Sequence, residues 1–424
     1  MQYSPGVNKY ERNRPFLRAF REVESHPYGF KYEPVDIVGS CTTPSLANLF
    51  QVFLRLGLTA FGGPAMLAHL KEVSVKRQGW LDEKIFNDGV VLCQSIPGAT
   101  AMQMAAYIGL KTRGIAGALV AYLGFGLPAF LFMLLLSIIY AGSHQLPLVV
   151  SLFSGLQVIV VAIVAHAVYA FSKTGIRDYG AKLFAVVAAL AFWQGVSPFI
   201  VIMAAGLGGA LFYKTPATGP AANLPKQDSR LIMRQVFLLL AIFLASLVGL
   251  YFYDASLSRL AVLMLKMDLF AFGGGFASVP LMLHEIVDVR GWLDSQTFMD
   301  GIALGQITPG PVVITATFVG YLLAGLVGAL VATIAIFAPS FLLLTVTAPV
   351  FDKLKAARYF PGITKGIFAS FVGLLFFVTW QFAFVVPWDV VRGLLMAAAL
   401  LALVKKLDIL YVVLIGATIS LALL

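Results

Sequence analysis

The chain has 424 residues, of which 60% are hydrophobic and only 12% are charged, and its mean hydropathy is +0.89. This composition excludes an ordinary soluble globular protein and indicates a membrane protein, because apolar stretches fill nearly everything after residue 46. The net charge of +10 fits basic cytoplasmic loops better than a nucleic-acid surface. Two cysteines, Cys41 and Cys93, make neither a disulfide framework nor a cysteine-based metal site.

The first 46 residues are polar and of mixed charge, and they include five prolines. They contain no apolar stretch of the kind found in a cleaved signal peptide. Six basic residues in this segment favour a cytoplasmic N-terminal tail.

Beyond the tail, the hydropathy pattern predicts an all-α polytopic membrane protein with about 13 spans. We expect a first repeat at 47–213, a linker with one unpaired span at 214–253, and a second repeat at 254–424. The last two spans of each half are short, and each pair could be one broken helix. The expected spans are 47–69, 88–110, 114–140, 148–172, 182–195, 198–213, 235–253, 259–283, 300–322, 324–350, 362–386, 390–404 and 409–424.

The two halves share motifs in the same order. Phe61-Gly62-Gly63-Pro64 returns 211 residues later as Phe272-Gly273-Gly274-Gly275, and Gly79-Trp80-Leu81-Asp82 returns as Gly291-Trp292-Leu293-Asp294. Gln94-Ser95-Ile96-Pro97-Gly98 returns as Gln306-Ile307-Thr308-Pro309-Gly310. This period is too long for a solenoid and indicates a duplicated domain.

The distribution of Lys and Arg predicts how the halves insert. With the N-terminus inside, the 13-span arrangement puts 21 basic residues on the cytoplasmic side and 6 outside. The charge bias of matching loops is opposite in the two halves, which predicts an inverted-topology repeat with substrate at the repeat interface. The basic loop from Lys71 to Lys84 is the one misfit, since it falls outside unless it dips inward.

A basic residue stands at the same apolar position in each half. Arg55 and Lys266 each precede the glycine motif by six residues. A charge at membrane depth costs about 2.5–3.5 kcal/mol on insertion scales, so it needs a partner or a water-filled cavity. The pair would suit a small divalent anion, whereas the alternative is that both side chains snorkel to an interface. Gly62, Gly63, Gly273 and Gly274 either pack helices closely or bring backbone amides to the ligand.

Pro97-Gly98 and Pro309-Gly310 predict a helix break in the middle of the second span of each half. A helix that restarts there presents free N–H groups to an anion. Polar residues surround both breaks, and the alternative is an ordinary proline kink. The predicted binding residues at the breaks are Gln94, Ser95, Gly98, Gln306, Thr308 and Gly310.

Acidic residues give weaker predictions. Asp268 is either a proton-linked carboxylate or the partner of a nearby base, and its repeat match is Gly57. Helix N-capping is sufficient to explain Asp88 and Asp300. His284-Glu285-Ile286-Val287-Asp288 narrowly misses a zinc-protease motif. We find no nucleotide-binding loop and no nucleophile with its base, and therefore expect no enzyme, cofactor or metal site.

Taken together, the duplicated motifs, with His69 beside the first, resemble the long two-domain form of the chromate ion transporter family over nearly all the chain after residue 46. The resemblance implies antiparallel homologous halves in a bacterial inner-membrane protein that exports chromate and so gives resistance, driven by the proton motive force. Gly275 stands where the first copy has Pro64.

The leading expectation is therefore a secondary chromate efflux transporter. Sulfate or another oxyanion, carried in either direction, is the alternative, because cationic side chains and backbone amides can hold any such anion. A membrane-embedded enzyme or a scaffold is the competing class. The expected partners are a small oxyanion and the lipid bilayer, with a homodimer allowed and nucleic acid excluded.

Overall fold

Helices make up the fold throughout residues 44–59, 63–213, 229–351 and 359–423, which are the residues that the computed structural model describes. No strand occurs within these ranges, so the expectation of an all-α membrane protein is confirmed. The predicted tail lies almost wholly outside them, as do Phe61 and Gly62 of the first glycine motif.

Helix α4 (Glu83–Ser95) and the start of α5 (Thr100–Ser143) form a hairpin. Tyr107 Oη donates a hydrogen bond to the Ile85 carbonyl at 3.3 Å, although 22 residues separate them. In one straight helix they would lie about 33 Å apart. The chain therefore reverses at residues 96–99, which we name the first tip, and the expectation of a single span over 88–110 is wrong.

The second half repeats this hairpin with α12 (Ser295–Ile307), η5 (Val312–Ile314) and α13 (Thr315–Thr347). Thr315 Oγ1 donates to the Gly301 carbonyl at 3.5 Å, and a Cβ added at Gly301 would meet the Phe318 ring at 2.4 Å. Here the reversal is at residues 308–311, the second tip. The expected span 300–322 is therefore also folded back on itself.

Both α5 and α13 contain a second reversal. Arg113 and Gly114 leave helical geometry in α5, and Ala324 and Gly325 do so in α13, with the two glycines at φ +64° and +60°. These φ values lie in the left-handed region that glycine tolerates best. Each helix is thus a short arm, 100–112 or 315–323, followed by a long arm, 115–143 or 326–347.

The stretch around Lys266 is also not one continuous span. Helix α10 (Ala255–Leu269) is followed by a non-helical loop, 270–274, and then by η3 (Gly275–Ala277), α11 (Ser278–Met282) and the π-helix η4 (Leu283–Val289). Asp254 and Arg290, at the two ends of this stretch, line the same cavity. The chain has therefore returned to its starting edge, which contradicts a crossing over 259–283. Its first-half counterpart comprises α2 (Leu46–Thr59), α3 (Gly63–Lys71) and the π-helix η2 (Glu72–Arg77).

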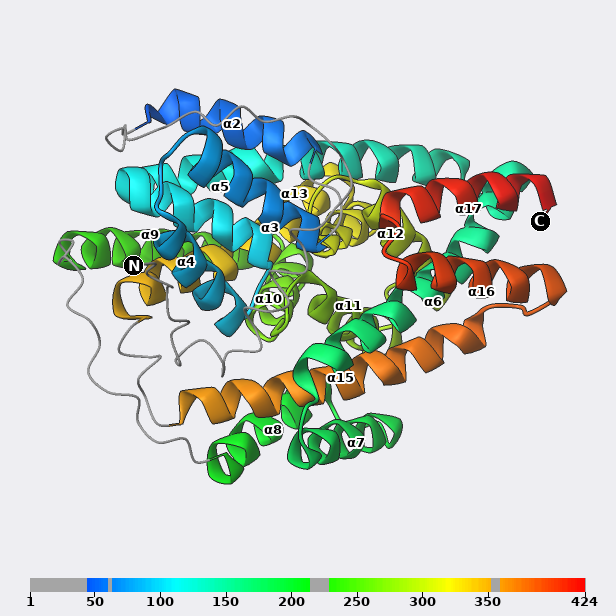
Figure 1. Cartoon of the computed structure of the whole chain (residues 1–424). Helices are drawn as coiled ribbons and strands as arrows, with labels where there is room; N and C mark the ends of the chain where they lie inside the picture. The colour runs from blue at the N-terminus through cyan, green and yellow to red at the C-terminus, as the bar shows by residue number, and fades with distance from the viewer. Residues whose placement is uncertain (1–43, 60–62, 214–228, 352–358, 424) are drawn as a thin grey trace, which may run out of the picture. The chain divides into compact units, whose positions relative to one another are not determined.

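Two further hairpins pack on the long helix of the other half (Figure 1). Helices α7 (Tyr179–Trp193) and α8 (Pro198–Phe212) pack on α15 (Phe360–Val385), while α16 (Val390–Val404) and α17 (Ile409–Leu423) pack on α6 (Pro147–Gly175). Tyr213 Oη, at the end of α8, donates to Asp178 Oδ1, at the start of α7, at 2.7 Å. The chain therefore leaves this hairpin next to the point where it entered.

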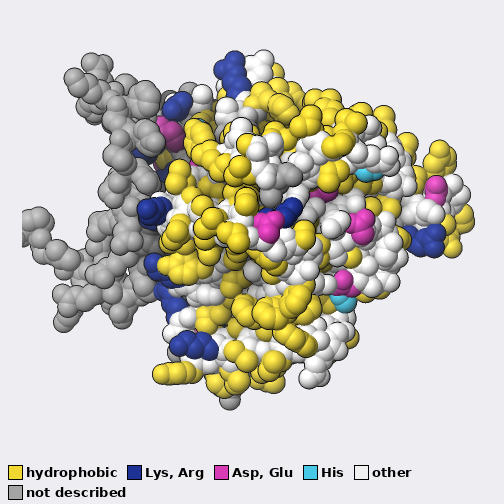
Figure 2. Space-filling model, turned by 90° about the vertical axis from the view of Figure 1, so that its right-hand side faces the viewer, with side chains coloured by type: hydrophobic (Ala, Val, Ile, Leu, Met, Phe, Trp, Pro, Cys, Tyr) yellow, Lys and Arg dark blue, Asp and Glu magenta, His cyan; other side chains and the backbone are white. Residues whose placement is uncertain are grey.

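Five described helical segments are long and apolar enough to cross a membrane. They are Thr100–Ser143, Pro147–Gly175, Arg234–Tyr253, Val312–Val350 and Phe360–Val385, the third lying within α9 (Ser229–Tyr253). The 15-residue helices extend only about 22 Å, which is shorter than a bilayer core of about 30 Å. Apolar side chains cover much of the face in Figure 2, with most visible Lys and Arg along one edge. Such a surface suits contact with lipid.

Candidate functional site

The first tip is held against the second half of the chain. Gly98 N donates to the Ala271 carbonyl at 3.0 Å, in the loop that follows α10. Gly98 has φ +118°, and a Cβ added there would lie 1.9 Å from Ser340 Oγ on α13. Only glycine satisfies both conditions, because a side chain would be strained in that conformation and would clash with Ser340.

Asp268 is fully buried beside this tip, near the end of α10. Its Oδ2 accepts hydrogen bonds from Ser340 N at 2.7 Å and from Ser340 Oγ at 2.6 Å. Ala99 N in turn donates to Ser340 Oγ at 3.3 Å, which ties the carboxylate to the first tip. No described basic residue forms an ion pair with Asp268, so its sequence-based alternative role as partner of a nearby base is wrong.

The arrangement is not symmetric. Gly57 and Ala129 occupy the positions that match Asp268 and Ser340 in the first half. A Cβ at Gly57 would lie 2.4 Å from the Phe125 carbonyl, so the backbone of α5 fills the space that a carboxylate would need. Ala129 instead packs against the second tip, where a Cβ at Gly310 would approach it to 2.7 Å. The buried acid and its hydroxyl partner therefore occur in one half only.

Polar atoms around the two tips have hydrogen-bonding capacity that no described residue uses. They are Asp268 Oδ1, Gln103 Oε1 and Gln306 Nε2. Gln103 Nε2 donates to the Pro97 carbonyl at 2.6 Å, and Thr308 Oγ1 donates to the Gly305 carbonyl at 3.0 Å. Because an unpaired buried polar group costs about 1–3 kcal/mol, these atoms fit a site for water or a polar ligand.

Other predicted site residues lie apart from these buried atoms or only border them. Gln94 is exposed, and Ser95 Oγ donates to the Val91 carbonyl of its own helix at 2.6 Å. Gly273 and Gly274 are half-buried in the loop after α10, and a Cβ at Gly274 would lie 3.5 Å from Thr100 Oγ1 beside the first tip. Gly62 lies outside the described residues, and Gly63 begins α3.

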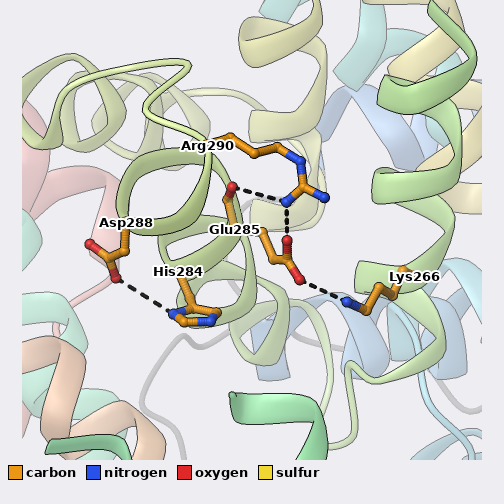
Figure 3. A network of polar contacts seen from close by, with 5 residues as sticks. All are labelled: Lys266, His284, Glu285, Asp288 and Arg290. Atoms are coloured by element: carbon orange, nitrogen blue, oxygen red, sulfur yellow. Dashed lines mark hydrogen bonds and ion pairs between the residues drawn. The ribbon is translucent and has the colours of Figure 1, made fainter. Parts of the chain in front are cut away.

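The two predicted cations differ in their surroundings. Lys266 Nζ donates to Glu285 Oε1 at 2.7 Å (Figure 3). It also lies 3.6 Å from the centre of the Phe199 ring. Arg290 binds the other oxygen of the same carboxylate. Arg55, by contrast, is exposed and forms no ion pair with a described residue. Arg55 and Lys266 therefore occupy equivalent positions in the repeat, but only Lys266 has an acidic partner among the described residues.

Asp300 is a buried polar residue whose environment the sequence did not reveal. The N-capping explanation is wrong, because Asp294 caps α12 by accepting from Thr297 N at 2.8 Å, and Asp82 precedes α4. Asp300 lies six residues after this cap and accepts from Tyr140 Oη at 2.9 Å and Gln157 Nε2 at 2.8 Å. In the sequence, Asp294 lies just before the helix and Thr297 follows three residues later, and this spacing could have identified Asp294 as the N-cap of α12.

Residues of the near-miss protease motif contact one another and helix α15. His284 Nδ1 lies 3.8 Å from Asp288 Oδ2, and Gln381 Nε2 donates to Asp288 Oδ1 at 3.0 Å. No group of three metal-binding side chains occurs among the residues that the structure describes.

These features define a helical multi-pass membrane protein with buried, unpaired polar atoms beside two chain reversals. The model of the family described as chromate transporter matches residues 47–210 and again 258–421. The chain belongs to this family, as the duplicated motifs indicated.

Comparison with curated proteins gives the same result. An uncharacterized transporter of Methanocaldococcus jannaschii is 47% identical over 88% of this chain and 93% of its own length. A chromate transport protein of Cupriavidus metallidurans is 32% identical over 80% and 82%, and one of Pseudomonas aeruginosa is 31% identical over 78% and 79%. No solved structure shows significant similarity.

Proposed function

We propose that this protein is a secondary transporter that exports chromate, a tetrahedral oxyanion, across the cytoplasmic membrane of a bacterial cell. The observation that carries the proposal is the buried meeting of the first tip with Asp268 and Ser340, in a chain of the chromate transporter family. Chain breaks near the middle of a membrane protein expose backbone donors that can replace water around an anion. Gly310, Gln306 and Thr308 are the proposed ligands at the tips, and Gly98, whose N–H already donates to the Ala271 carbonyl, is proposed to allow the close approach of the backbone.

The proposed topology has five crossing helices. The two halves have opposite orientations, because α9 crosses the membrane once between them. Arg113 Nε donates to the Pro44 carbonyl at 2.6 Å, so the end of the short arm of α5 lies beside the start of α2. This contact supports a first half in which the chain up to residue 113 returns to the edge from which it started. The loop from Lys71 to Lys84 then lies on the cytoplasmic side, which removes the one misfit in the charge distribution. Arg259 and Arg290 lie on the opposite side.

Asp268 is the proposed proton-coupling residue. A buried carboxylate without a cation favours its neutral form, and Ser340 can donate to it in its charged form. Its position between the two halves would let one proton bind or leave as the tips rearrange. Arg55, Lys266 and the glycines at 62, 63, 273 and 274 would provide the positive charge and the close backbone approach.

The deciding experiment is chromate flux into liposomes that contain the purified protein, with the pH gradient imposed or collapsed. Flux that needs the protein and responds to the gradient is expected, and chromate-resistant growth of cells that carry the gene should follow. Absence of flux would reject a transporter and leave a membrane enzyme or a scaffold. If sulfate is transported equally well, the proposed substrate becomes tetrahedral oxyanions in general and not chromate alone.

A further inference from the structure

The carboxylate of Glu285 bridges two cations that come from different parts of the chain (Figure 3). Its side chain is only 7% exposed, whereas those of Lys266 and Arg290 are 41% and 34% exposed. Lys266 comes from α10, and Arg290 directly follows η4. The three side chains together carry a net charge of +1, with the negative charge at the centre.

The local helix geometry produces this bridge. A π-helix forms hydrogen bonds between residues five apart, so Glu285 and Arg290 fall on the same side of η4. Arg290 Nη1 also donates to the Glu285 carbonyl at 3.3 Å. The guanidinium is thus fixed beside the carboxylate while the flexible lysine stem approaches from α10.

A cavity lies beside this group and shares Arg290 with it. It has a volume of about 490 Å³, and its lining includes the cations Arg259 and Arg290 together with Asp254 and Trp292. Arg259 and Lys266 are seven residues apart on α10, about two turns, so they face the same way with Arg290 beside both. An anion in this cavity would meet Arg290 first and then Lys266.

We propose that Glu285 is a tethered anion that occupies the Lys266–Arg290 cation pair and exchanges with the transported oxyanion. The inference rests on the proposed transport function, and it assigns Glu285 a positioning role with the cavity as the vestibule through which a tetrahedral dianion reaches or leaves Lys266. A dianion can displace a single carboxylate from two cations, and the return of Glu285 assists its release. Without Glu285, the anion should bind more tightly and leave more slowly.

The test is equilibrium dialysis of the full-length protein in detergent against labelled chromate and, separately, labelled sulfate. Glu285→Gln should lower the Kd by about tenfold, because it removes a competing charge and leaves two cations free. Turnover in liposomes should fall. If wild-type binding is too weak to measure, binding should become measurable in Glu285→Gln.

Glu72 is the matched control. It also lies in a π-helix, with Lys76 Nζ and Arg77 Nε each 3.5 Å from its carboxylate, but both cations are largely exposed. Glu72→Gln should leave the Kd unchanged. The variant Lys266→Gln/Glu285→Gln should lose the gain in affinity, which separates anion competition from a general change in the fold.

An unchanged or higher Kd in a monodisperse Glu285→Gln protein would overturn the inference, as would an equal gain in Glu72→Gln. So would undetectable binding of both anions in the wild type and in Glu285→Gln. Tighter binding in Glu285→Gln together with no flux by the wild type would reject the proposed transport while supporting the tethered anion. The two failures are therefore distinguishable.

Discussion

Ser340 donates both its backbone N–H and its hydroxyl to the same oxygen of Asp268, at 2.7 and 2.6 Å. The same hydroxyl accepts from Ala99 N of the first tip at 3.3 Å. Protonation of Asp268 would therefore weaken the hydrogen bonds that it accepts from Ser340. Ser340 in turn contacts the first tip directly. This gives a short physical route from protonation of the acid to movement of the proposed anion site.

Asp268→Asn should uncouple transport from the pH gradient without preventing insertion. The Asn side-chain oxygen can still accept from Ser340, although a neutral acceptor forms a hydrogen bond weaker by about 1 kcal/mol than a carboxylate. Chromate flux should persist as exchange but lose its response to an imposed gradient. Asp408→Asn, at an exposed position, is the control and should respond like the wild type. Full gradient dependence in Asp268→Asn would show that protons couple elsewhere.

Gly98→Ala should destabilise the protein and abolish flux. The methyl group would lie 1.9 Å from Ser340 Oγ, at a backbone conformation that costs a non-glycine residue about 1–3 kcal/mol. Gly249→Ala is the matched control, since a Cβ there meets nothing within 4 Å and alanine favours a helix. Thermal unfolding in detergent should separate the two variants. A normal melting temperature for Gly98→Ala would mean that the tip is looser than its contacts indicate.

The hairpin arrangement predicts on which side the loop after η2 lies. In a background of Cys41→Ser and Cys93→Ala, a cysteine at Gln78 should react with an impermeant maleimide only from the cytoplasmic side. A cysteine at Val289, just before Arg290, should react only from outside. A continuous 13-span arrangement predicts the reverse for both positions, so labelling of intact cells against inverted vesicles decides between them.

A hydrogen bond from Lys365 lowers the pKa of Asp178 to about 2, against a smaller upward effect of burial. Because the folded-state pKa is below the ordinary value of 3.8, this stabilisation is full above about pH 4 and is lost as pH falls towards 2. Lys365→Met should therefore lower the melting temperature at pH 7, and the difference from wild type should shrink at acidic pH. The effect should be small, about 0.2–1 kcal/mol, as for other exposed pairs. Lys84→Met is the control. An equal drop in its melting temperature would show that the effect of Lys365→Met does not come from the Lys365–Asp178 pair.

The sequence predicted the helix breaks well, because proline and glycine act locally and both tips leave helical geometry where Pro97-Gly98 and Pro309-Gly310 stand. It predicted the crossings poorly. Hydropathy registers how apolar a stretch is but not whether the chain continues or turns back after a break. Contacts such as Tyr107 with Ile85 are needed to show the reversal.

The candidate site divides in the same way. Repetition identified Arg55 and Lys266 as equivalent positions, yet the partner of Lys266 is Glu285, which no repeat comparison singled out. Asp268 was recognised as unusual because its match is glycine, whereas its partner Ser340 lies 72 residues away on a different helix. Pairings of this kind depend on tertiary packing, which the local sequence does not encode.

Asp268 and Ser340 in the second half match Gly57 and Ala129 in the first half, and this inequality bears on the proposed proton coupling. Two identical half-length chains that formed the same fold would have to carry the acid either twice or not at all. Joining both halves in one chain allows a single carboxylate beside the two tips. If Asp268 couples transport to protons as proposed, this chain has one carboxylate that binds at most one proton, whereas a twofold-symmetric assembly would carry two carboxylates that titrate as a pair.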